Sequence, residues 1–236
     1  MAAIFRYDDA VLARFPEVVG GVILARGVVN GPTPAALAEA YAAEQAATIA
    51  RIGATPLSQL PSLTAWRAAF RGFGVEPTQY RCAAEALLRR LTKSGSIPSL
   101  NTLVDLGNLI SIRHALPVAI FDLRETTGPV TVRFAEGTER FTPLGQELAE
   151  QPAPGEVIFC DDSGLVSARR WCWRQSAESA ARADTTTVLI TVEAQHAGGR
   201  TAVEAALREL LALLPLGQGG EVQAALLDSN RSALAV

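Results

Sequence analysis

The sequence has 236 residues, of which 49% are hydrophobic and 19% charged, so it can bury a sizeable core and is not a disordered chain. Its net charge of -3 argues against a protein that coats nucleic acid with a basic surface, but it is compatible with a local basic patch. The three cysteines are widely separated and only two histidines occur, which argues against a metal site and against a Ser-His-Asp triad.

Targeting signals are not apparent in the sequence. Residues 1–9 contain no apolar run of signal-peptide length, and no stretch of about 18 apolar residues occurs elsewhere. An odd number of dispersed cysteines is typical of reduced thiols in a cytosolic protein. We therefore expect a soluble, cytoplasmic protein that has no membrane partner, no cofactor and no metal.

The first third of the chain combines strand and helix patterns. Apolar, β-rich sequence predicts strands over residues 5–8 and 17–29, and the second of these closes in a turn at Asn30-Gly31-Pro32. Ala-, Glu- and Leu-rich sequence then predicts helices over residues 34–51 and 63–73.

Two further helices are predicted next, and each carries polar residues at helical spacing. Residues 78–93 form the clearest amphipathic pattern, in which Glu85 and Arg89 lie one turn apart and fit a weak surface ion pair. The next helix, over residues 101–114, carries three polar residues on one face: Asn101, Asp105 and Asn108. These three fit either a solvated face with an asparagine cap or one wall of a site, where Asp105 pairs with an arginine.

The second half of the chain predicts mainly strands. Short apolar segments indicate strands over residues 117–123, 130–134, 156–160, 165–173 and 186–193. A late helix over 200–214 and a last strand over 222–227 complete the pattern, and the Pro-, Glu- and Gly-rich piece 145–155 is expected to be a surface loop. Helices in the first half and strands in the second half predict an α+β fold around one core.

The densest cluster of unusual residues is the Arg/Trp block, residues 169–176, which reads Arg-Arg-Trp-Cys-Trp-Arg-Gln-Ser. An extended strand would place alternate side chains of the block on opposite faces. One face would then carry Arg170, Cys172 and Arg174, and the other would carry Trp171, Trp173 and Gln175. Two interpretations remain open: a structural strand whose tryptophans fill the core, or a site whose arginines bind phosphate or carboxylate groups and whose tryptophans stack on a base.

Cys172 lies between two arginines, which favour a reactive thiolate. No histidine stands near Cys172 in the sequence to act as its base, and a small buried cysteine is the ordinary outcome. We therefore expect Cys172 to be structural.

Three segments together resemble the B3/B4 domain of the phenylalanyl-tRNA synthetase beta subunit, in its free-standing form. They are Tyr80–Arg90 (YRCAAEALLRR), Ile97–Asp122 (from IPSLNTLVDLGN to LPVAIFD), and the Arg/Trp block with the preceding Pro154-Gly155-Glu156-Val157. The resemblance covers about residues 60–195, and we expect residues 1–236 to form a single B3/B4-like domain. It implies a three-layer α+β sandwich of mixed and antiparallel β-sheet with helices.

In the synthetases this domain hydrolyses tyrosine that has been wrongly attached to the tRNA for phenylalanine. The sequence departs from the synthetase pattern at two places. Ala119 stands where the synthetase motif has histidine, and the nearest match to a downstream glutamate that reads the substrate is Gln175. Cys172 departs from the free-standing relatives, which have asparagine there. Catalytic residues therefore do not carry over from the resemblance.

The leading hypothesis is a protein that binds the 3′ end of an aminoacyl-tRNA and hydrolyses mischarged aminoacyl-tRNA in trans. The alternative is a non-catalytic module that binds RNA or an amino-acid-like small molecule and has lost the editing chemistry. No catalytic residue is assigned. The candidate substrate-binding residues are Glu85, Asn101, Asp105, Asn108, Arg170, Trp171, Trp173, Arg174 and Gln175.

Overall fold

The apolar run around residue 20 forms the middle of a four-stranded antiparallel sheet in the computed structural model, which describes residues 3–235. The strand order is β3–β8–β2–β9, and the bounds are β2 (Val19–Val28), β3 (Val118–Asp122), β8 (Thr187–Ala194) and β9 (Leu216–Leu227). Seven of the eight residues of β8 are buried, which explains its nearly continuous apolar sequence: both faces of the sheet are covered.

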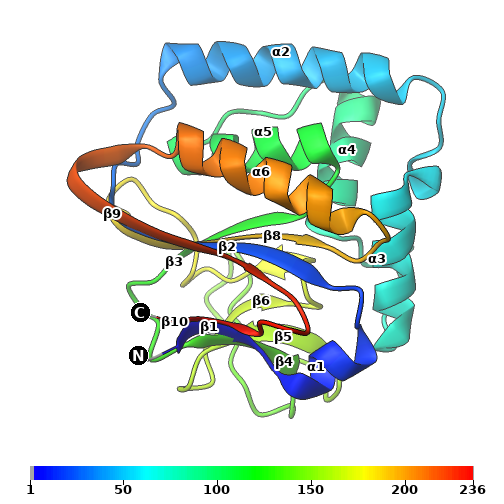
Figure 1. Cartoon of the computed structure of the whole chain (residues 1–236), viewed down its shortest axis with the longest axis vertical. Coiled ribbons are helices and arrows are strands. Elements are labelled where there is room, and N and C mark those ends of the chain that lie inside the picture. The colour runs from blue at the N-terminus through cyan, green and yellow to red at the C-terminus, as the bar shows by residue number, and fades with distance from the viewer. Residues whose placement is uncertain (1–2, 236) are drawn as a thin grey trace.

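A second, six-stranded sheet lies against the first. Its order is β10–β1–β4–β5–β6–β7. The bounds are β1 (Ala3–Tyr7), β4 (Val130–Phe134), β5 (Val157–Cys160), β6 (Val166–Arg169), β7 (Arg174–Gln175) and β10 (Ala233–Ala235). Only β1 and β4 pair in parallel, and the other neighbours are antiparallel. The first and last strands of the described chain therefore pair in this sheet, β1 with β10 (Figure 1).

Helices α5 and α6 lie directly on the outer face of the four-stranded sheet and α2 lies beyond α5, whereas α1 packs against β4 of the other sheet (Figure 1). The bounds are α1 (Asp9–Arg14), α2 (Ala35–Ile52), η1 (Leu57–Gln59), α3 (Pro61–Gly72), α4 (Ala83–Ser94), α5 (Thr102–His114) and α6 (Gly199–Leu213). None of the helices in residues 3–235 combines the length and the apolar content that a bilayer crossing requires. The arrangement of helices, sheet and sheet confirms the expected α+β sandwich.

Aromatic side chains fill the space between the two sheets. The rings of Phe121 on β3 and Phe159 on β5 lie 5.2 Å apart. A carboxyl group is buried in the same layer: Glu193 on β8 accepts hydrogen bonds from the Tyr7 hydroxyl at 2.6 Å and from the Trp171 indole at 3.0 Å. Burial raises the pKa of Glu193 to about 7 because the charged form loses its hydration.

The structure corrects several element boundaries. The helix expected from residue 78 begins at Ala83, the last long strand begins at residue 216, and α1, η1 and β10 lack a clear signal in the sequence. The largest error concerns the strand expected over 165–173, which ends at Arg169. Arg170 and Trp171 have left-handed φ values of 46° and 55°, so the chain turns there and the expected alternation of faces is wrong.

Candidate binding cleft

A cleft with a volume of about 470 Å³ lies between α5 and the strands β3 and β7. It is lined by Leu100, Asn101, Val104, Gly107, Asn108, Val118, Ile120, Leu144, Gln175, Ala180 and Ala181. Most of these side chains are apolar, and three carry amides. Asn101, Val104 and Asn108 share one face of α5 because their spacing of three and four residues follows the helical repeat.

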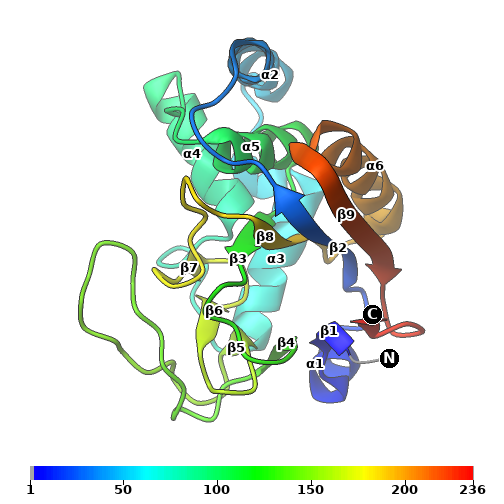
Figure 2. The ribbon, with the colours of Figure 1, turned by 90° about the vertical axis from the view of Figure 1, so that its left-hand side faces the viewer.

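The cleft lies where the edges of the two sheets meet. Strand β3 is the edge of the four-stranded sheet and β7 is the edge of the six-stranded sheet, and Figure 2 shows β7 next to β3. The Gln175 side chain joins them, since its Nε2 donates to the carbonyl oxygen of Ile120 at 2.8 Å and to that of Ser179 at 2.5 Å. Gln175 therefore holds two sheet edges together while it lines the cleft.

The close approach of α5 to β3 depends on Gly107. A methyl group at this position would lie 3.1 Å from Cδ1 of Ile120 and 3.6 Å from Cγ1 of Val118. Such distances are at or below ordinary van der Waals contact, so a larger residue would push the helix away or displace Ile120. The small residue thus sets the width of the cleft.

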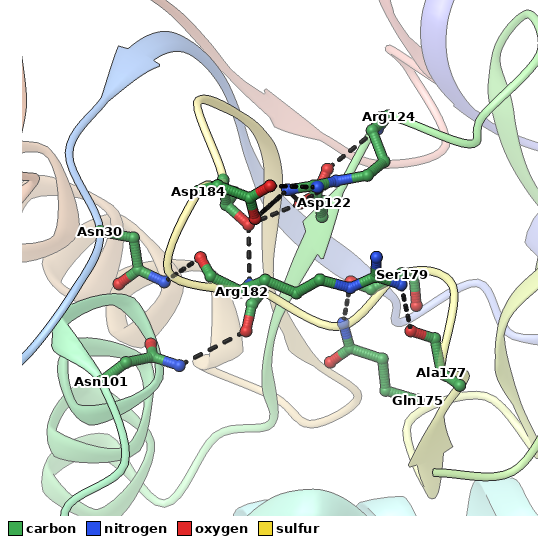
Figure 3. Close-up of polar contacts among 11 residues, drawn as sticks. Asn30, Asn101, Asp122, Arg124, Gln175, Ala177, Ser179, Arg182 and Asp184 are labelled. Carbon is green, nitrogen blue, oxygen red and sulfur yellow. Dashed lines mark hydrogen bonds and ion pairs between the residues drawn. The ribbon is translucent and has the colours of Figure 1, made fainter. Parts of the chain in front are cut away.

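The rim of the cleft is formed by the segment between β7 and β8, which we call the rim segment (residues 176–186). Two asparagines attach it to the start of α5 (Figure 3). Asn101 caps the helix by accepting from the Val104 amide at 3.0 Å, and its Nδ2 donates to the Ala181 carbonyl oxygen at 3.4 Å. Asn30 accepts from the Leu103 amide at 3.1 Å and donates to the Arg182 carbonyl oxygen at 2.8 Å.

The other side of the rim segment is fixed by an ion-pair cluster at the end of β3 (Figure 3). Arg124 lies between Asp122, at 2.7 Å, and Asp184, at 2.8 Å. The hydroxyl of Thr185 donates to Asp122 at 2.5 Å. Burial works against the charged form of Asp122, but hydrogen bonds from Arg124 and Thr185 outweigh this effect and hold the pKa of Asp122 below its usual range.

Asp105 has a different environment from the one expected. Its carboxylate is fully buried and accepts hydrogen bonds from the Thr33 hydroxyl at 2.6 Å, from the Ser99 hydroxyl and from the Leu100 amide at 2.9 Å. The expected ion pair with an arginine is wrong, because hydroxyl and amide donors from the loops before α2 and α5 satisfy the carboxylate. Asp105 fixes the loop that carries Leu100 and does not itself line the cleft.

The Arg/Trp block divides at the turn after Arg169. Trp171 is completely buried and packs edge to face against Trp66, with ring centres 5.2 Å apart, and against Phe15 at 5.1 Å. Arg169 is also buried and pairs with Glu156 at 2.8 Å. These two residues therefore hold the turn in the core.

The remaining arginines of the block stack on aromatic rings. The guanidinium carbon of Arg170 lies 3.8 Å from the ring centre of Tyr80 and 4.6 Å from that of Trp173, and Arg174 lies 4.6 Å from Trp173. Arg170 also lies 3.6 Å from Glu156. Both guanidinium groups therefore stack on Trp173, and the rings of Trp173 and Tyr80 pack edge to face with their centres 5.0 Å apart.

Cys172 and Glu85, two other residues singled out from the sequence, are both buried. Burial raises the pKa of the Cys172 thiol well above its usual value, as expected for a structural cysteine and contrary to a reactive thiolate. Glu85 is 1% exposed and lies within ion-pair distance of Arg67, Arg81 and Arg89. The expected weak surface pair between Glu85 and Arg89 is therefore part of a larger cluster, in which the carboxylate is buried and Arg89 is about half exposed.

Of the nine residues singled out from the sequence, the cleft brings together Asn101, Asn108 and Gln175. The other six lie outside its lining: Glu85, Asp105, Arg170, Trp171, Trp173 and Arg174. Sequence reasoning missed Asn30 and the rim residues Ala180 and Ala181. Asn30 was assigned to a turn, and nothing in its local sequence indicates that its side chain reaches across to residue 182.

The chemistry of the cleft is that of neutral amides on apolar walls. Both hydrogen-bond partners of the Gln175 Nε2 are carbonyl oxygens, so this atom is the nitrogen and the Oε1 atom of the same side chain is an acceptor. None of the residues that line the cleft carries a carboxylate, an imidazole, a thiol or a cationic group. The cleft thus offers apolar contacts and amide hydrogen-bonding groups, and its lining offers no charge.

Comparisons with known proteins agree with the resemblance in the sequence. The model of the B3/4 domain matches residues 65–209, which is more than half of the chain. The phenylalanine–tRNA ligase beta subunit of Nitrobacter winogradskyi is 32% identical over 83 residues, or 35% of this chain and 10% of that protein. This chain thus spans about a tenth of the length of that relative. A crystal structure of an N-terminal fragment of the phenylalanyl-tRNA synthetase beta subunit from Pyrococcus horikoshii matches with a TM-score of 0.38 and 17% identity, covering 52% of this chain and 45% of that one.

Proposed function

This chain belongs to the B3/4 domain family, and on that premise we propose that it binds the aminoacylated 3′ end of a transfer RNA, with the aminoacyl group in the cleft between α5 and β3. The N. winogradskyi relative is a phenylalanine–tRNA ligase beta subunit. Because one fold hosts many functions, the proposal rests on the chemistry of the cleft as well as on the family.

The observation that carries the proposal is the fixed Gln175 amide in a mostly apolar cleft. Its two donor hydrogens are engaged by main-chain oxygens, so its acceptor oxygen, which has no hydrogen-bond partner among the described residues, is held in place before a ligand arrives. An α-amino group offers hydrogen-bond donors for such an acceptor, and Val104, Val118 and Ile120 offer contacts for an apolar amino-acid side chain. Mostly apolar walls with a few placed polar groups are typical of small-molecule sites.

The other candidate residues line the cleft, hold the elements around it or lie beside it. Asn101 and Asn108 form the wall opposite Gln175, and Trp171 supports the β6–β7 turn from the core. Arg174 directly precedes Gln175 and is exposed, so its guanidinium is available for the phosphate of the terminal nucleotide. Glu85 and Asp105 act through the elements that they hold.

Hydrolysis of the ester would require a mechanism without an ionisable side chain in the cleft. Amide groups can orient a water molecule and stabilise a developing oxyanion, but none of the lining residues can remove a proton at neutral pH. Ala119, where the resemblance has histidine, fits the same pattern. This observation favours the second candidate function, a module that binds an aminoacyl group and does not hydrolyse it.

A deacylation assay separates the two candidates. Wild-type protein is mixed with a panel of mischarged tRNAs, and ester loss is compared with the uncatalysed rate and with that of the Arg174→Ala variant. A rate above background that falls in the variant supports editing in trans. Binding of aminoacyl-tRNA with no rate above background supports the binding module, and the absence of both binding and rate contradicts the proposed function.

A further inference from the structure

A second concave region lies away from the cleft, between η1 and α4. It has a volume of about 550 Å³ and is lined by Pro56, Leu57, Ser58, Arg81, Arg89, Thr92 and Lys93. We call it the basic hollow. Three of these seven residues are cationic and none is acidic, in a protein whose net charge is -3. The local excess of positive charge is therefore a feature of this region and not of the whole surface.

The two arginines of the basic hollow are oriented by a buried carboxylate. Glu85 is 1% exposed, and its Oε1 atom lies 2.9 Å from Nε of Arg89 and 3.8 Å from Nε of Arg81. A third cation, Arg67, lies 3.3 Å from the same oxygen. Three guanidinium groups share this one carboxylate, so Arg81 and Arg89 are only partly neutralised by it and an anion would complete the compensation.

The hydrogen bonds of these side chains leave several donors free. Arg89 donates from Nε to Glu85 at 2.9 Å, whereas Nε of Arg81 lies 3.8 Å from the same oxygen and makes no hydrogen bond to it. Among the described residues, no hydrogen bond engages the Nη groups of either arginine or the ammonium group of Lys93. Because a guanidinium that is anchored at Nε has already lost much of its side-chain freedom, it binds an oxyanion at a smaller entropic cost than a free surface arginine.

We propose that the basic hollow is a binding site for a phosphate group, held by Arg81, Arg89 and Lys93. The planar guanidinium donors match the oxygens of phosphate, and the lysine adds a point charge. An RNA backbone and a free phosphate compound present the same chemistry to this site, and the titrations below distinguish them. The inference stands on the charges and geometry of the basic hollow and does not require the cleft to bind an aminoacyl group.

Two variants test the site without disturbing Glu85. Lys93→Gln removes a cation that has no ion pair among the described residues, and Ser58→Glu places a carboxylate at an exposed lining position. Each has a matched control with the same change of charge outside the basic hollow. Arg90→Gln lies on the same helix, and Gln151→Glu lies in an exposed loop.

Binding of inorganic pyrophosphate is measured by NMR titration at constant ionic strength. We expect saturable shifts of amides in η1 and α4 for wild type and for both controls. We expect the dissociation constant to rise about tenfold in Lys93→Gln, as for the loss of one charge-assisted contact, and binding to be lost in Ser58→Glu. The proposal is overturned if wild type shows no saturable shifts there, or if the controls weaken binding as much as the two variants do.

A parallel titration with single-stranded RNA identifies the source of the phosphate. If an RNA backbone occupies the site, Lys93→Gln should make the negative slope of log affinity against log salt shallower by about 0.7, and Arg90→Gln should leave it unchanged. If RNA binding does not depend on Lys93 while pyrophosphate binding does, the site takes a free phosphate compound. Neither result depends on the deacylation assay or on Gln175, so the two proposals fail separately.

Discussion

The Nε2 atom of Gln175 lies 2.8 Å from the carbonyl oxygen of Ile120, and this contact joins the edge of one β-sheet to the edge of the other. The same nitrogen donates to Ser179 in the rim segment. One side chain therefore connects both sheets and the rim at the place where the cleft forms. The shape of the cleft therefore depends on the two hydrogen bonds that Gln175 donates.

Replacing Gln175 with leucine should destabilise the protein and weaken ligand binding together. The substitution removes the donor from the carbonyl oxygens of Ile120 and Ser179, and each carbonyl that stays buried without a partner costs about 1–3 kcal/mol. Urea unfolding measures the change in the free energy of unfolding. Gln151→Leu, which makes the same chemical change in an exposed loop, should leave it within about 0.5 kcal/mol of wild type.

Gly20 should not tolerate a side chain while Tyr7 keeps its hydroxyl group. A methyl group on Gly20 would lie 2.2 Å from the Tyr7 oxygen, which cannot move away freely because it donates to Glu193 at 2.6 Å. Overpacking of this kind costs about 1–3 kcal/mol. In a double-mutant cycle, Tyr7→Phe should recover part of the loss caused by Gly20→Ala, and strictly additive effects would contradict the contact.

The buried Glu193 should make stability fall as the pH rises. Its pKa is about 7 in the folded protein and near 4.5 in the unfolded chain, so between these values the folded state binds more protons and unfolding becomes easier with increasing pH. The full effect is about 3 kcal/mol, since one unit of pKa corresponds to about 1.4 kcal/mol.

Glu193→Gln isolates this contribution. The variant should lose less stability than wild type between pH 5 and pH 8, as measured by urea unfolding at the two pH values. The carboxyls with lowered pKa, such as Asp122 and Glu44, are partly protonated only in the unfolded chain near pH 5, so they add a small slope of opposite sign that is the same in both proteins. Equal losses in the two proteins would show that Glu193 is not protonated in the folded state.

Glu85→Gln should reduce stability by about 1.5–3 kcal/mol, because it removes a buried carboxylate that pairs with three arginines, two of which are partly exposed to water. Thermal unfolding checks this value. Glu178→Gln, which removes a carboxylate paired with the largely exposed Arg140, is the control and should cost about 1 kcal/mol or less. A small effect of Glu85→Gln would contradict the assignment of Glu85 to a structural charge cluster.

The sequence was most informative where a pattern is local. The helix itself, the cap at Asn101 and the shared face of Asn101 and Asn108 could be predicted, since they depend on residues within two turns of α5, whereas Asp105 is buried away from that face. The family resemblance supplied the layered fold and pointed to Gln175. The proposed single domain over residues 1–236 stays a prediction.

The sequence was least informative where a backbone turn or a distant partner decides the outcome. Nothing in Arg170-Trp171 indicates left-handed φ values, which are uncommon for such residues and are held here by the burial of Trp171 and Arg169. The partners of Asp105 and Asn30 lie as many as 152 residues away in the sequence. Such contacts depend on the tertiary fold, and local spacing does not reveal them.

The most direct test of the central claim is a calorimetric titration with 3′-aminoacylamino-3′-deoxyadenosines, whose amide link resists hydrolysis, carrying leucine, phenylalanine, tyrosine or aspartate. The account predicts saturable binding of at least one of the first three and weaker binding of the aspartate compound. It also predicts that Val104→Phe, which fills the cleft, weakens binding at least tenfold, whereas Val29→Phe at an exposed position does not. Undiminished binding to Val104→Phe, or no binding of any compound to wild type, would contradict it.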